Sequence, residues 1–290
     1  MRSAIEFLLL GLVWGASFAL YRVAIPEFGL AATVSLRLLL AATALCLVFG
    51  SPLRSVATID RRRTLGWLAL IGAGTTALPF TLFAETVMRS SAGFAAVLNA
   101  SSPLFSALLA VCVWREALSR SKAVGLMLGF AGVALLASLR ELGPLRIGID
   151  AVLLGLAGAA CYGLGVQLAR RKLGDLNASA VATGFSVTGA ILLLPWALVS
   201  LPAALPSWPA ISAVLVLGLV STALGNVMYF RLLGRIGATP ALSVTFVIPP
   251  FAMLWGHLLF EEVPTPAMLA STAVILVGTA LTLGWRRTPR

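Results

Sequence analysis

One stretch of this sequence occurs twice, and this repeat constrains the fold more than any other feature. Residues 72–136 return as residues 218–282, at a constant shift of 146 positions. Matches of Leu or Ala carry little information in so apolar a chain, but Pro, Arg and Glu recur at the same shift. An internal repeat determines the whole architecture, and in a membrane protein it indicates a transporter whose binding site lies between two halves. The matched pairs are Arg89 with Arg235, Pro103 with Pro249, Phe105 with Phe251 and Glu116 with Glu262.

The composition places the chain in a lipid bilayer. Of its 290 residues, 60% are hydrophobic and 11% are charged, whereas about a quarter of a soluble domain is charged. The net charge of +11 is compatible with a nucleic-acid binder, but the Arg residues lie in short loops between apolar runs. We therefore expect lipid and a small-molecule substrate as partners, and no nucleic acid. The three cysteines lie inside apolar runs without a CxxC spacing and are interpreted as packing residues.

Ten apolar runs of about 20 residues predict transmembrane helices. The first run resembles a signal peptide, but nothing soluble follows it, so we expect a retained helix. The sequence thus predicts an all-α integral membrane protein, with one five-helix repeat over residues 1–145 and a second over residues 146–290. The expected spans are residues 4–24, 31–49, 65–88, 91–113, 121–139, 149–169, 179–200, 209–233, 238–260 and 266–284.

The distribution of Lys and Arg predicts the orientation. If the N-terminus is cytoplasmic, sixteen of these residues lie inside and four outside, while Arg37 lies within a span. We therefore expect both termini in the cytoplasm and the protein in the inner membrane. Five spans per half is an odd number, so the second half is expected to be inverted. Glu116 then ends span 4 inside and Glu262 ends span 9 outside, the inverted repeat that underlies alternating access.

The chain resembles the drug/metabolite transporter superfamily, and within it the EamA-type family. The resemblance rests on the opening motif Gly-Leu-Val-Trp-Gly-Ala-Ser-Phe at residues 11–18, on Arg37 among apolar residues, and on the duplicated Pro-then-Glu pattern of spans 4 and 9. It covers nearly the whole chain and is specific for the fold but weak for the substrate. It implies an exporter of small metabolites, and the leading interpretation is one similar to bacterial aromatic and neutral amino-acid exporters. The second half departs from the pattern by doubling its acid as Glu261-Glu262.

Residues that break a helix lie at matched positions and predict hinges. A proline inside a helix removes the hydrogen bond to the carbonyl four residues earlier. Pro103 therefore frees the carbonyl of Asn99, and Pro249 frees that of its repeat partner Thr245. Unpaired carbonyls at membrane depth must face protein or a wet cavity; the alternative is a kink that a neighbouring Ser or Thr satisfies. The four hinge candidates are Pro79, Pro103, Gly225 and Pro249.

Aromatic and amide side chains predict a binding cavity. An aromatic lining suits an apolar or aromatic substrate side chain, while amide and hydroxyl groups reach polar groups of the substrate. Buried amides are costly without a partner. The competing interpretation is that the aromatic residues only pack. The expected cavity residues are Trp14, Phe18, Phe80, Phe83, Asn99, Tyr162, Asn226, Tyr229 and Thr245.

Arg37 lies about two turns inside span 2, at a depth where a cation is expensive and functional by default. Three roles remain open for it: to attract a substrate carboxylate, to hold a helix end, or to pair with Glu27 or Glu85. The resemblance favours a structural role, because the family broadly carries an Arg here across different substrates.

The other polar groups are expected to be structural. Glu85 and Arg89 are spaced as a favourable helical pair. Glu116 and Glu262 lie at span ends, where we expect them to cap the next helix or hold an Arg rather than contact the substrate. His257 is the only histidine and lacks the acidic or cysteine neighbours of a metal site. The ring could instead sense protons, but we expect a satisfied packing histidine, and neither a metal nor a cofactor.

These features favour a facilitative exporter. Proton-driven carriers usually bury acids midway through the membrane, whereas Glu85, the only acid well inside a span, lies near an end. The alternative is a proton-coupled exporter of lipophilic cations, which would need Glu85 to face the cavity. No GxSxG motif, metal constellation or phosphate loop indicates an enzyme; a scaffold has no use for matched bends, and a channel needs a polar lining. The small-residue pairs Gly11/Gly15 and Gly125/Gly129 are expected to contact helices within the bundle, in a monomer or weak homodimer.

Overall fold

The structure, a computed structural model, describes residues 2–51, 60–138, 147–236 and 243–283. Within these ranges the chain is helical apart from short turns, and no strand occurs. Helices suit such apolar runs because each satisfies its own backbone hydrogen bonds where lipid offers none. The elements are α1 (Arg2–Phe28), α2 (Leu30–Phe49), α4 (Arg61–Gly72), the π-helix η1 (Ala73–Ala77), α5 (Leu78–Met88), α6 (Ala92–Asn99), α7 (Ser102–Cys112), α8 (Arg120–Ser138), α9 (Ile149–Lys172), α10 (Ala178–Val199), α11 (Trp208–Leu215), the π-helix η2 (Val216–Leu224), α12 (Gly225–Ile236), the 3₁₀-helix η3 (Ser243–Phe246), α14 (Ile248–Phe260) and α15 (Pro266–Leu283).

Nine helical stretches in the described part of the chain are long and apolar enough to cross a membrane. The tenth expected span, residues 238–260, begins outside the described residues, and its described portion is the shorter apolar stretch Val244–Phe260. An all-α membrane protein is thus confirmed, while ten spans in two inverted repeats stay a prediction. The nine stretches are Ala4–Phe28, Leu30–Phe49, Arg61–Met88, Ala92–Cys112, Arg120–Ser138, Ile149–Lys172, Ala178–Val199, Trp208–Tyr229 and Pro266–Leu283.

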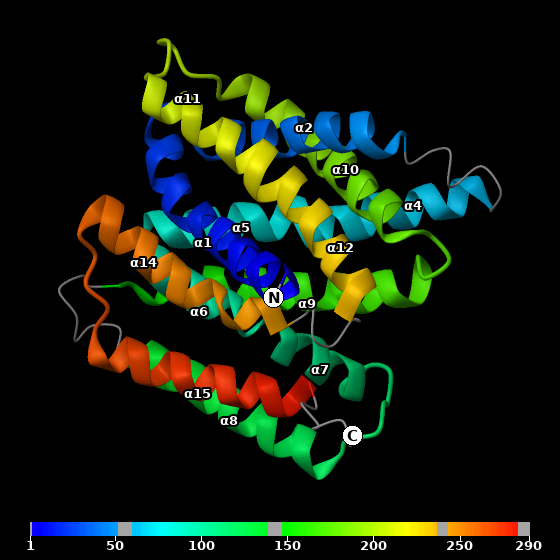
Figure 1. Cartoon of the computed structure of the whole chain (residues 1–290), viewed down its shortest axis with the longest axis vertical. Coiled ribbons are helices and arrows are strands. Elements are labelled where there is room, and N and C mark those ends of the chain that lie inside the picture. Colours follow the sequence, from blue (N-terminus) through cyan, green and yellow to red (C-terminus); the bar gives the residue numbers. More distant parts are fainter. Residues whose placement is uncertain (1, 52–59, 139–146, 237–242, 284–290) are drawn as a thin grey trace.

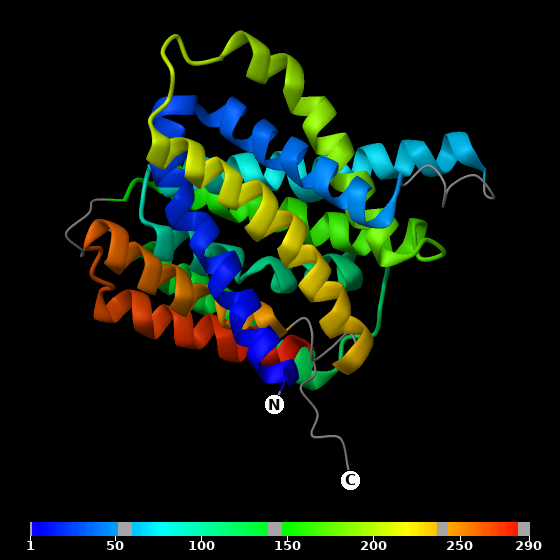
Figure 2. The same cartoon turned by 45° about the horizontal axis from the view of Figure 1, so that its top comes forward.

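Two helix pairs form opposite flanks of the molecule. α10 lies along α2 at one flank and α15 lies along α8 at the other (Figures 1 and 2). In the α8–α15 pair, a Cβ on Gly125 would meet backbone atoms of Thr282 and Gly278, and a Cβ on Gly278 would meet backbone atoms of Gly129. Small residues let the two helix backbones touch. The expected partners of this glycine motif therefore lie within the bundle.

Between the flanks, helices from the first 145 residues interlock with helices from the rest of the chain. α1 runs beside α14, where a Cβ on Gly15 would lie 2.8 Å from Phe251 Cβ. α9 runs beside α7, where a Cβ on Gly163 would lie 3.1 Å from Phe105 Cβ. At each of these two contacts, the glycine seams, a glycine of one half packs against a phenylalanine of the other half. The two phenylalanines, Phe105 and Phe251, are repeat partners.

The largest cluster of buried side chains lies where these helices meet. It joins Phe18 and Tyr21 of α1, Phe83 of α5, Val214 of α11 and Ile248 of α14. Both halves of the chain contribute to this cluster. Its packing, which rests on close contact of many apolar atoms, therefore depends on the two halves together.

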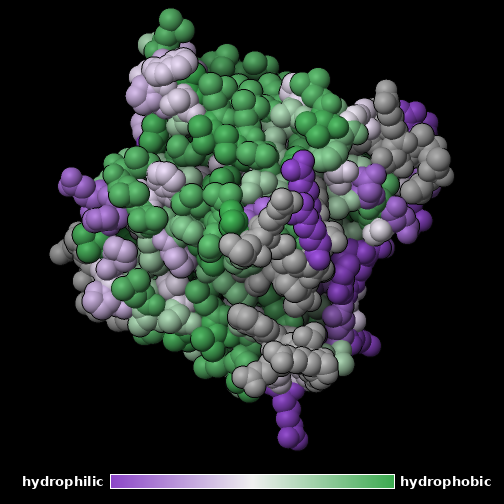
Figure 3. Space-filling view, in the orientation of Figure 1, coloured by the Kyte–Doolittle hydropathy of each residue, from purple (hydrophilic) through white to green (hydrophobic). Residues whose placement is uncertain are grey.

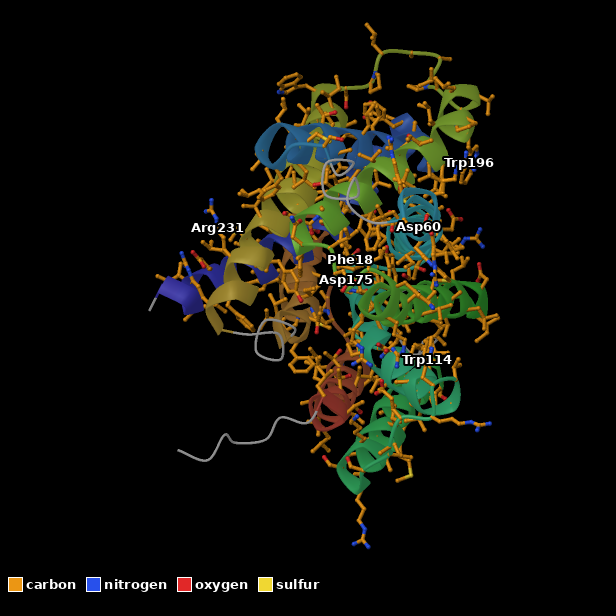
Figure 4. All side chains as sticks on the ribbon, turned by 90° about the vertical axis from the view of Figure 1, so that its right-hand side faces the viewer. Phe18, Asp60, Trp114, Asp175, Trp196 and Arg231 are labelled. Carbon is orange, nitrogen blue, oxygen red and sulfur yellow. The ribbon has the colours of Figure 1, made fainter. Side chains whose placement is uncertain are left out.

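Charged residues gather at the two ends of the bundle. In Figure 1 most helices run across the view, and Figure 3 shows an apolar middle with hydrophilic residues mostly toward the left and right edges. Figure 4 looks onto the right-hand end, where Asp60, Trp114 and Asp175 are labelled. We call this the basic end, because it includes the start of α4, the end of α9 and the start of α8. The described basic residues of these segments and of the last two turns of α12 are Arg61, Arg62, Arg63, Arg115, Arg120, Lys122, Arg170, Arg171, Lys172, Arg231 and Arg235.

At the opposite end, acids and bases pair more evenly. Arg89 lies 2.6 Å from Glu85 and 2.5 Å from Asp150, joining α5 to the start of α9. Arg22, near the end of α1, forms an ion pair with Glu262, just after α14. The two ends of the bundle therefore differ in charge: one is basic, and the other carries ion pairs that tie helices together.

Candidate functional site

Spans 3 and 8 each contain a π-helical segment at the matched position. η1 covers Ala73–Ala77, and the shift of 146 places its counterpart at residues 219–223, within η2. π-Helical segments are rare and frequently mark functional sites. The predicted hinge Pro79 lies in the first turn of α5, directly after η1, and the predicted hinge Gly225 is the first residue of α12, directly after η2. Both spans therefore change helix geometry at the same point of the repeat.

The other two hinge candidates also lie at helix breaks. α6 ends at Asn99, and α7 begins with Pro103 in its first turn. Ser102 Oγ donates to the Asn99 carbonyl at 2.7 Å, so a neighbouring serine satisfies the carbonyl that Pro103 frees. In span 9, Thr245 lies in η3 and Pro249 begins α14 after it. Whether these breaks bend during transport stays a prediction.

Trp14 of α1 contacts the second π-helix directly. Its indole Nε1 donates to the Ser221 carbonyl at 3.0 Å, and its ring centroid lies 5.6 Å from that of Tyr229. Gly225 makes room for the indole, because a Cβ there would lie 2.6 Å from Trp14 Nε1. A buried indole N–H needs an acceptor, and η2 supplies one. Two expected cavity residues therefore meet: Trp14 of α1 and Tyr229 of α12.

The phenylalanines of the expected cavity lie in the core. Phe18 and Phe83 are buried, with ring centroids 6.3 Å apart in an edge-to-face arrangement, and Figure 4 places Phe18 near the centre of the molecule. Phe80 packs against the same cluster and lies beneath Arg37, whose guanidinium carbon is 4.3 Å from the ring centroid. For Phe18 and Phe83 the structure therefore shows packing.

Arg37 is 5% exposed, and it connects three helices. Its Nε donates to Thr222 Oγ1 of η2 at 2.8 Å, and its Nη1 donates to the Tyr21 hydroxyl of α1 at 2.6 Å. Neither acid considered as a partner is used: Glu85 pairs with Arg89, and Glu27 accepts hydrogen bonds from Ser207 at the start of α11. Arg37 thus holds α2 against α1 and η2 without a carboxylate.

Polar groups with accessible surface lie near Tyr229. Tyr162 of α9 keeps 38% of its surface accessible and lies close to Tyr229. Asn226, on the helix turn before Tyr229, is partly buried and forms no hydrogen bond to any described residue. Its amide is therefore available to a bound molecule.

The two repeat-related glutamates each pair with arginine in the structure. Glu262 pairs with Arg22 and accepts from the Ala92 amide at 3.2 Å, so it also caps α6. Of the doubled acids it is Glu262 that takes this role. Glu116 pairs with Arg170 and lies 2.6 Å from Arg171, at the end of α9. Each glutamate therefore joins its own half to the first helix of the other half.

The environments of these two carboxyls shift their pKa values in opposite directions. Burial raises the pKa of Glu262 above its ordinary value, although Arg22 and the Ala92 amide act in the opposite sense. Partial burial also favours a higher pKa for Glu116, but the charges and hydrogen bonds of Arg170 and Arg171 outweigh it, and the pKa is lowered.

His257 is exposed rather than packed, which differs from the expected role. Its Nδ1 lies 3.2 Å from the Glu262 carbonyl oxygen, so the ring is satisfied by backbone. The short turn after α14 brings this carbonyl back toward the helix end, with Glu261 in the left-handed conformation at φ 56°. Among the described residues no group of three His, Cys, Asp or Glu side chains is arranged to hold a metal ion.

Several polar groups of this region escape the sequence analysis. Tyr21 continues the stripe of Trp14 and Phe18 along α1 at helical spacing, so the spacing alone points to it. Thr222 is the repeat partner of Thr76, yet nothing in the sequence shows that it accepts from Arg37. Gln167 of α9, another overlooked amide, donates to Ser106 Oγ of α7 at 2.9 Å.

An all-helical, multi-pass bundle with broken helices and polar groups at membrane depth defines a membrane transporter. The chain belongs to the EamA-like transporter family, whose sequence profile matches residues 1–138 and 150–284. This confirms the family resemblance found in the sequence. The family and the named relatives are transporters, which places this chain among the membrane transporters.

Known proteins resemble it over most of its length. A probable terminal-alkyne amino-acid exporter of Streptantibioticus cattleyicolor is 29% identical over 283 residues, which cover 94% of this chain and 92% of that protein. An uncharacterized transporter of Archaeoglobus fulgidus is 27% identical over 189 residues, which cover 65% and 66% of the two chains. A solved crystal structure superimposes with a TM-score of 0.61 over 97% of this chain and 96% of its own, at 17% identity. That last similarity shows the fold alone.

Proposed function

We propose that this protein is a facilitative exporter of amino acids, most of all aromatic and neutral ones, which works by alternating access between two inverted five-helix halves. The observation that carries the proposal is the pair of π-helices at matched positions, with Trp14 hydrogen-bonded to the second of them. A broken helix exposes backbone polar groups only where it lines a cavity or is buried in protein. Repeat-related breaks are typical of transporters that bind substrate between their halves.

The exchange of partners between halves supports this mechanism. α1 packs on α14 and α9 packs on α7, and the glutamate at the end of each partner span binds an arginine of the first helix of the other half. The Glu262–Arg22 pair lies at one end of the bundle, and the Glu116–Arg171 pair lies at the basic end. In an inverted repeat, such pairs are equivalent and sit on opposite sides of the membrane. Breaking one while keeping the other would open one side at a time.

Amino-acid cargo is supported by the relative that is a probable amino-acid exporter and by the polar and aromatic groups around Tyr229. Trp14 and Tyr229 offer aromatic surface, and Tyr162 and Asn226 are polar residues that are not fully buried. Sites for small molecules combine an apolar lining with a few polar groups of this kind.

The carboxylates support facilitative transport. In the described part of the chain, Glu6, Glu85, Glu116 and Glu262 each pair with an arginine at a helix end. A proton-coupled exporter of lipophilic cations would need an acid facing the cavity, but Glu85 pairs with Arg89, which also pairs with Asp150 at the start of α9. No observation on this structure therefore favours the multidrug alternative.

The orientation proposed is that the basic end faces the cytoplasm, in the inner membrane, because Lys and Arg collect on the cytoplasmic side. α1 begins at this end, since Glu6 pairs with Arg235 at 2.7 Å. α15 ends beside the start of α8, where Ser121 Oγ donates to the Leu281 carbonyl. This arrangement supports both termini lying in the cytoplasm.

Counterflow in proteoliposomes tests the function. Vesicles loaded with unlabelled amino acids should take up labelled Phe, Thr and Met without any ion gradient. Asn226→Leu and Trp14→Phe should lower this uptake, whereas Trp208→Phe, at an exposed indole, should leave it unchanged. Lack of uptake of every amino acid by folded, inserted protein would overturn the cargo assignment. Uphill accumulation driven by a pH gradient alone would overturn the facilitative mechanism.

A further inference from the structure

A cation is buried at membrane depth without an acid beside it. Arg37 is only 5% exposed, and it lies on α2 between α1, α5 and η2. No described carboxylate forms an ion pair with it, since both candidate acids have other partners. A buried charge left without a counter-charge is strongly unfavourable, and within membranes such residues mark ligand pathways.

The guanidinium group is held rigidly, but one edge of it is unused. Thr222 Oγ1 accepts a hydrogen bond from Nε, and the Tyr21 hydroxyl accepts one from Nη1. The guanidinium carbon lies 4.3 Å from the centroid of the Phe80 ring. Nη2 forms no hydrogen bond to any described residue, and it is absent from the fully enclosed atoms that lack a partner. It therefore keeps both its donors and some accessible surface. The Thr222 and Tyr21 hydroxyls are uncharged, so they fix the position of the guanidinium group without neutralising its charge.

A second unused polar group lies on the facing helix. Ser17 Oγ of α1 is buried and has no hydrogen-bond partner among the described residues. Ser17 lies one helical turn before Tyr21, which holds Arg37, and nearly one turn after Trp14, which holds η2. Residues three and four apart share a helix face, so Ser17 belongs to the stripe of α1 that meets Arg37 and η2. A buried polar atom without a partner requires a structural or functional explanation.

We propose that Arg37 Nη2 and Ser17 Oγ bind the carboxylate group of the transported substrate. The inference rests on the proposed function and deepens it, because it names the substrate group that is recognised. A carboxylate supplies the counter-charge that Arg37 lacks, and its second oxygen accepts from the serine hydroxyl. Guanidinium groups match carboxylates through charge-assisted hydrogen bonds. Phe80 and the ring of Tyr21 then keep the pair out of water, where it is strongest.

A substrate-binding role for Arg37 and a purely structural role predict different responses to the charge of the substrate's carboxylate. If Arg37 only clamps α2 to η2, the protein handles a carboxylate and its amide alike. If Arg37 binds the carboxylate, an uncharged amide in its place leaves the guanidinium unpaired. Loss of one partner of a buried charge pair costs about 2–5 kcal/mol, which corresponds to a loss of about 30-fold or more in affinity.

The test compares Phe with phenylalaninamide in counterflow, and phenylacetate with phenylacetamide as ligands that raise the Tm of the purified protein. In the wild type, Phe should exchange with a KM about 30-fold or more below that of the amide, and only the carboxylates should raise the Tm. Arg37→Gln should remove this discrimination, Arg37→Lys should retain part of it, and Tyr21→Phe, which keeps the cation, should change it less.

The outcomes separate the site from the function. Equal KM values for Phe and its amide in the wild type would overturn the carboxylate site and leave the amino-acid exporter standing. Absence of exchange, with carboxylates still raising the Tm through Arg37, would overturn the amino-acid cargo and keep the site. Absence of both responses would overturn both. The wild-type comparison needs no variant, so a misfolded Arg37→Gln protein leaves the result decisive.

Discussion

The segments 72–116 and 218–262 repeat one another in sequence but differ in what their π-helices bind. In η1, the Thr76 hydroxyl donates to the Gly72 carbonyl of its own helix at 2.7 Å, and it lies 3.1 Å from the Phe185 carbonyl. In η2, the repeat partner Thr222 accepts from the charged side chain of Arg37. Ser221, next to it, receives the indole of Trp14. One copy bonds to backbone, whereas the other copy gathers polar side chains from α1 and α2.

This difference separates the features that both copies of the repeat share from the features that only one copy has. A π-helix followed by a helix-breaking residue is present in both copies, so the backbone device belongs to the repeat. The contacts of Arg37 and Trp14 occur on η2 alone, so they serve substrate binding or stabilise a single conformational state. The variants below test the two parts separately, beginning with the shared packing and ending with the two glutamates.

The largest effect is expected at the two glycine seams. In Gly15→Leu the new side chain meets the backbone of Ala252, 2.9 Å from its Cβ position, and in Gly163→Leu it meets the Ser106 backbone nitrogen at 2.7 Å. Because neither neighbour can move aside cheaply, each change should cost about 3 kcal/mol or more. Yield of monodisperse protein and Tm in detergent measure the loss.

Gly66→Leu is the control, because no other atom lies within 4 Å of its Cβ position. If the two seams are equivalent, Gly15→Leu and Gly163→Leu lower the Tm similarly while the control does not. A seam that accepts Leu without loss would show that the corresponding helices separate easily, against the matched packing described here.

Removing the threonine hydroxyl should affect the two π-helices unequally. Thr222→Val leaves the buried Nε of Arg37 without its acceptor, and an unsatisfied buried donor costs about 1–3 kcal/mol. Thr76→Val removes a hydroxyl bonded to backbone carbonyls and leaves no charged group unpaired, so about 1 kcal/mol or less is expected. Tm values of the two variants decide the comparison. Equal losses would mean that Arg37 finds another acceptor and that the copies are not specialised.

Pro79 and Gly225 occupy the same position after the two π-helices and should also differ. Gly225→Ala places a Cβ 2.6 Å from Trp14 Nε1, so the indole must leave the Ser221 carbonyl. Counterflow should fall about tenfold, which equals about 1.4 kcal/mol. Pro79→Ala introduces no such clash and should change transport less than about twofold. A Pro79→Ala variant more impaired than Gly225→Ala would move the substrate contact to the first copy.

The sequence predicts the large features of this fold because they follow from long apolar runs and from exact matches. The hinge positions appear as Pro and Gly at one shift. Pro103 and Pro249 lie where a helix is interrupted, and Pro79 and Gly225 lie where a π-helix passes into an α-helix. The π-helices themselves do not appear, because a hydropathy pattern does not distinguish i→i+5 from i→i+4 hydrogen bonds. The start of span 9 lies outside the described residues, so the count of ten spans remains a sequence prediction.

The side chains of the site are harder to predict, because pairing depends on contacts between distant helices. Trp14 and Tyr229 were grouped by residue type alone and do meet. Tyr21 and Ser17 were overlooked, although they share the α1 face of Trp14, because a tyrosine or serine in a membrane helix usually packs. The partner of Arg37 was sought among acids near in sequence, whereas Thr222 is 185 residues away.

The smallest effect is expected from the pH dependence of Glu116→Gln and Glu262→Gln. The pKa of Glu116 is lowered, so its ionised form stabilises the fold above the ordinary value of 4.5, and this stabilisation is lost as pH falls through the lowered pKa. The pKa of Glu262 is raised by burial, so ionisation weakens the fold as pH rises from 4.5 through the raised pKa. The Tm of Glu116→Gln should therefore fall furthest below the wild type at neutral pH and approach it in acid. The gap for Glu262→Gln should instead be widest in acid and narrow toward neutral pH. Differences on the order of 1 °C are expected, measured by intrinsic fluorescence between about pH 3 and pH 7. Parallel pH profiles for the two variants would show that these repeat-related carboxyls occupy equivalent environments after all.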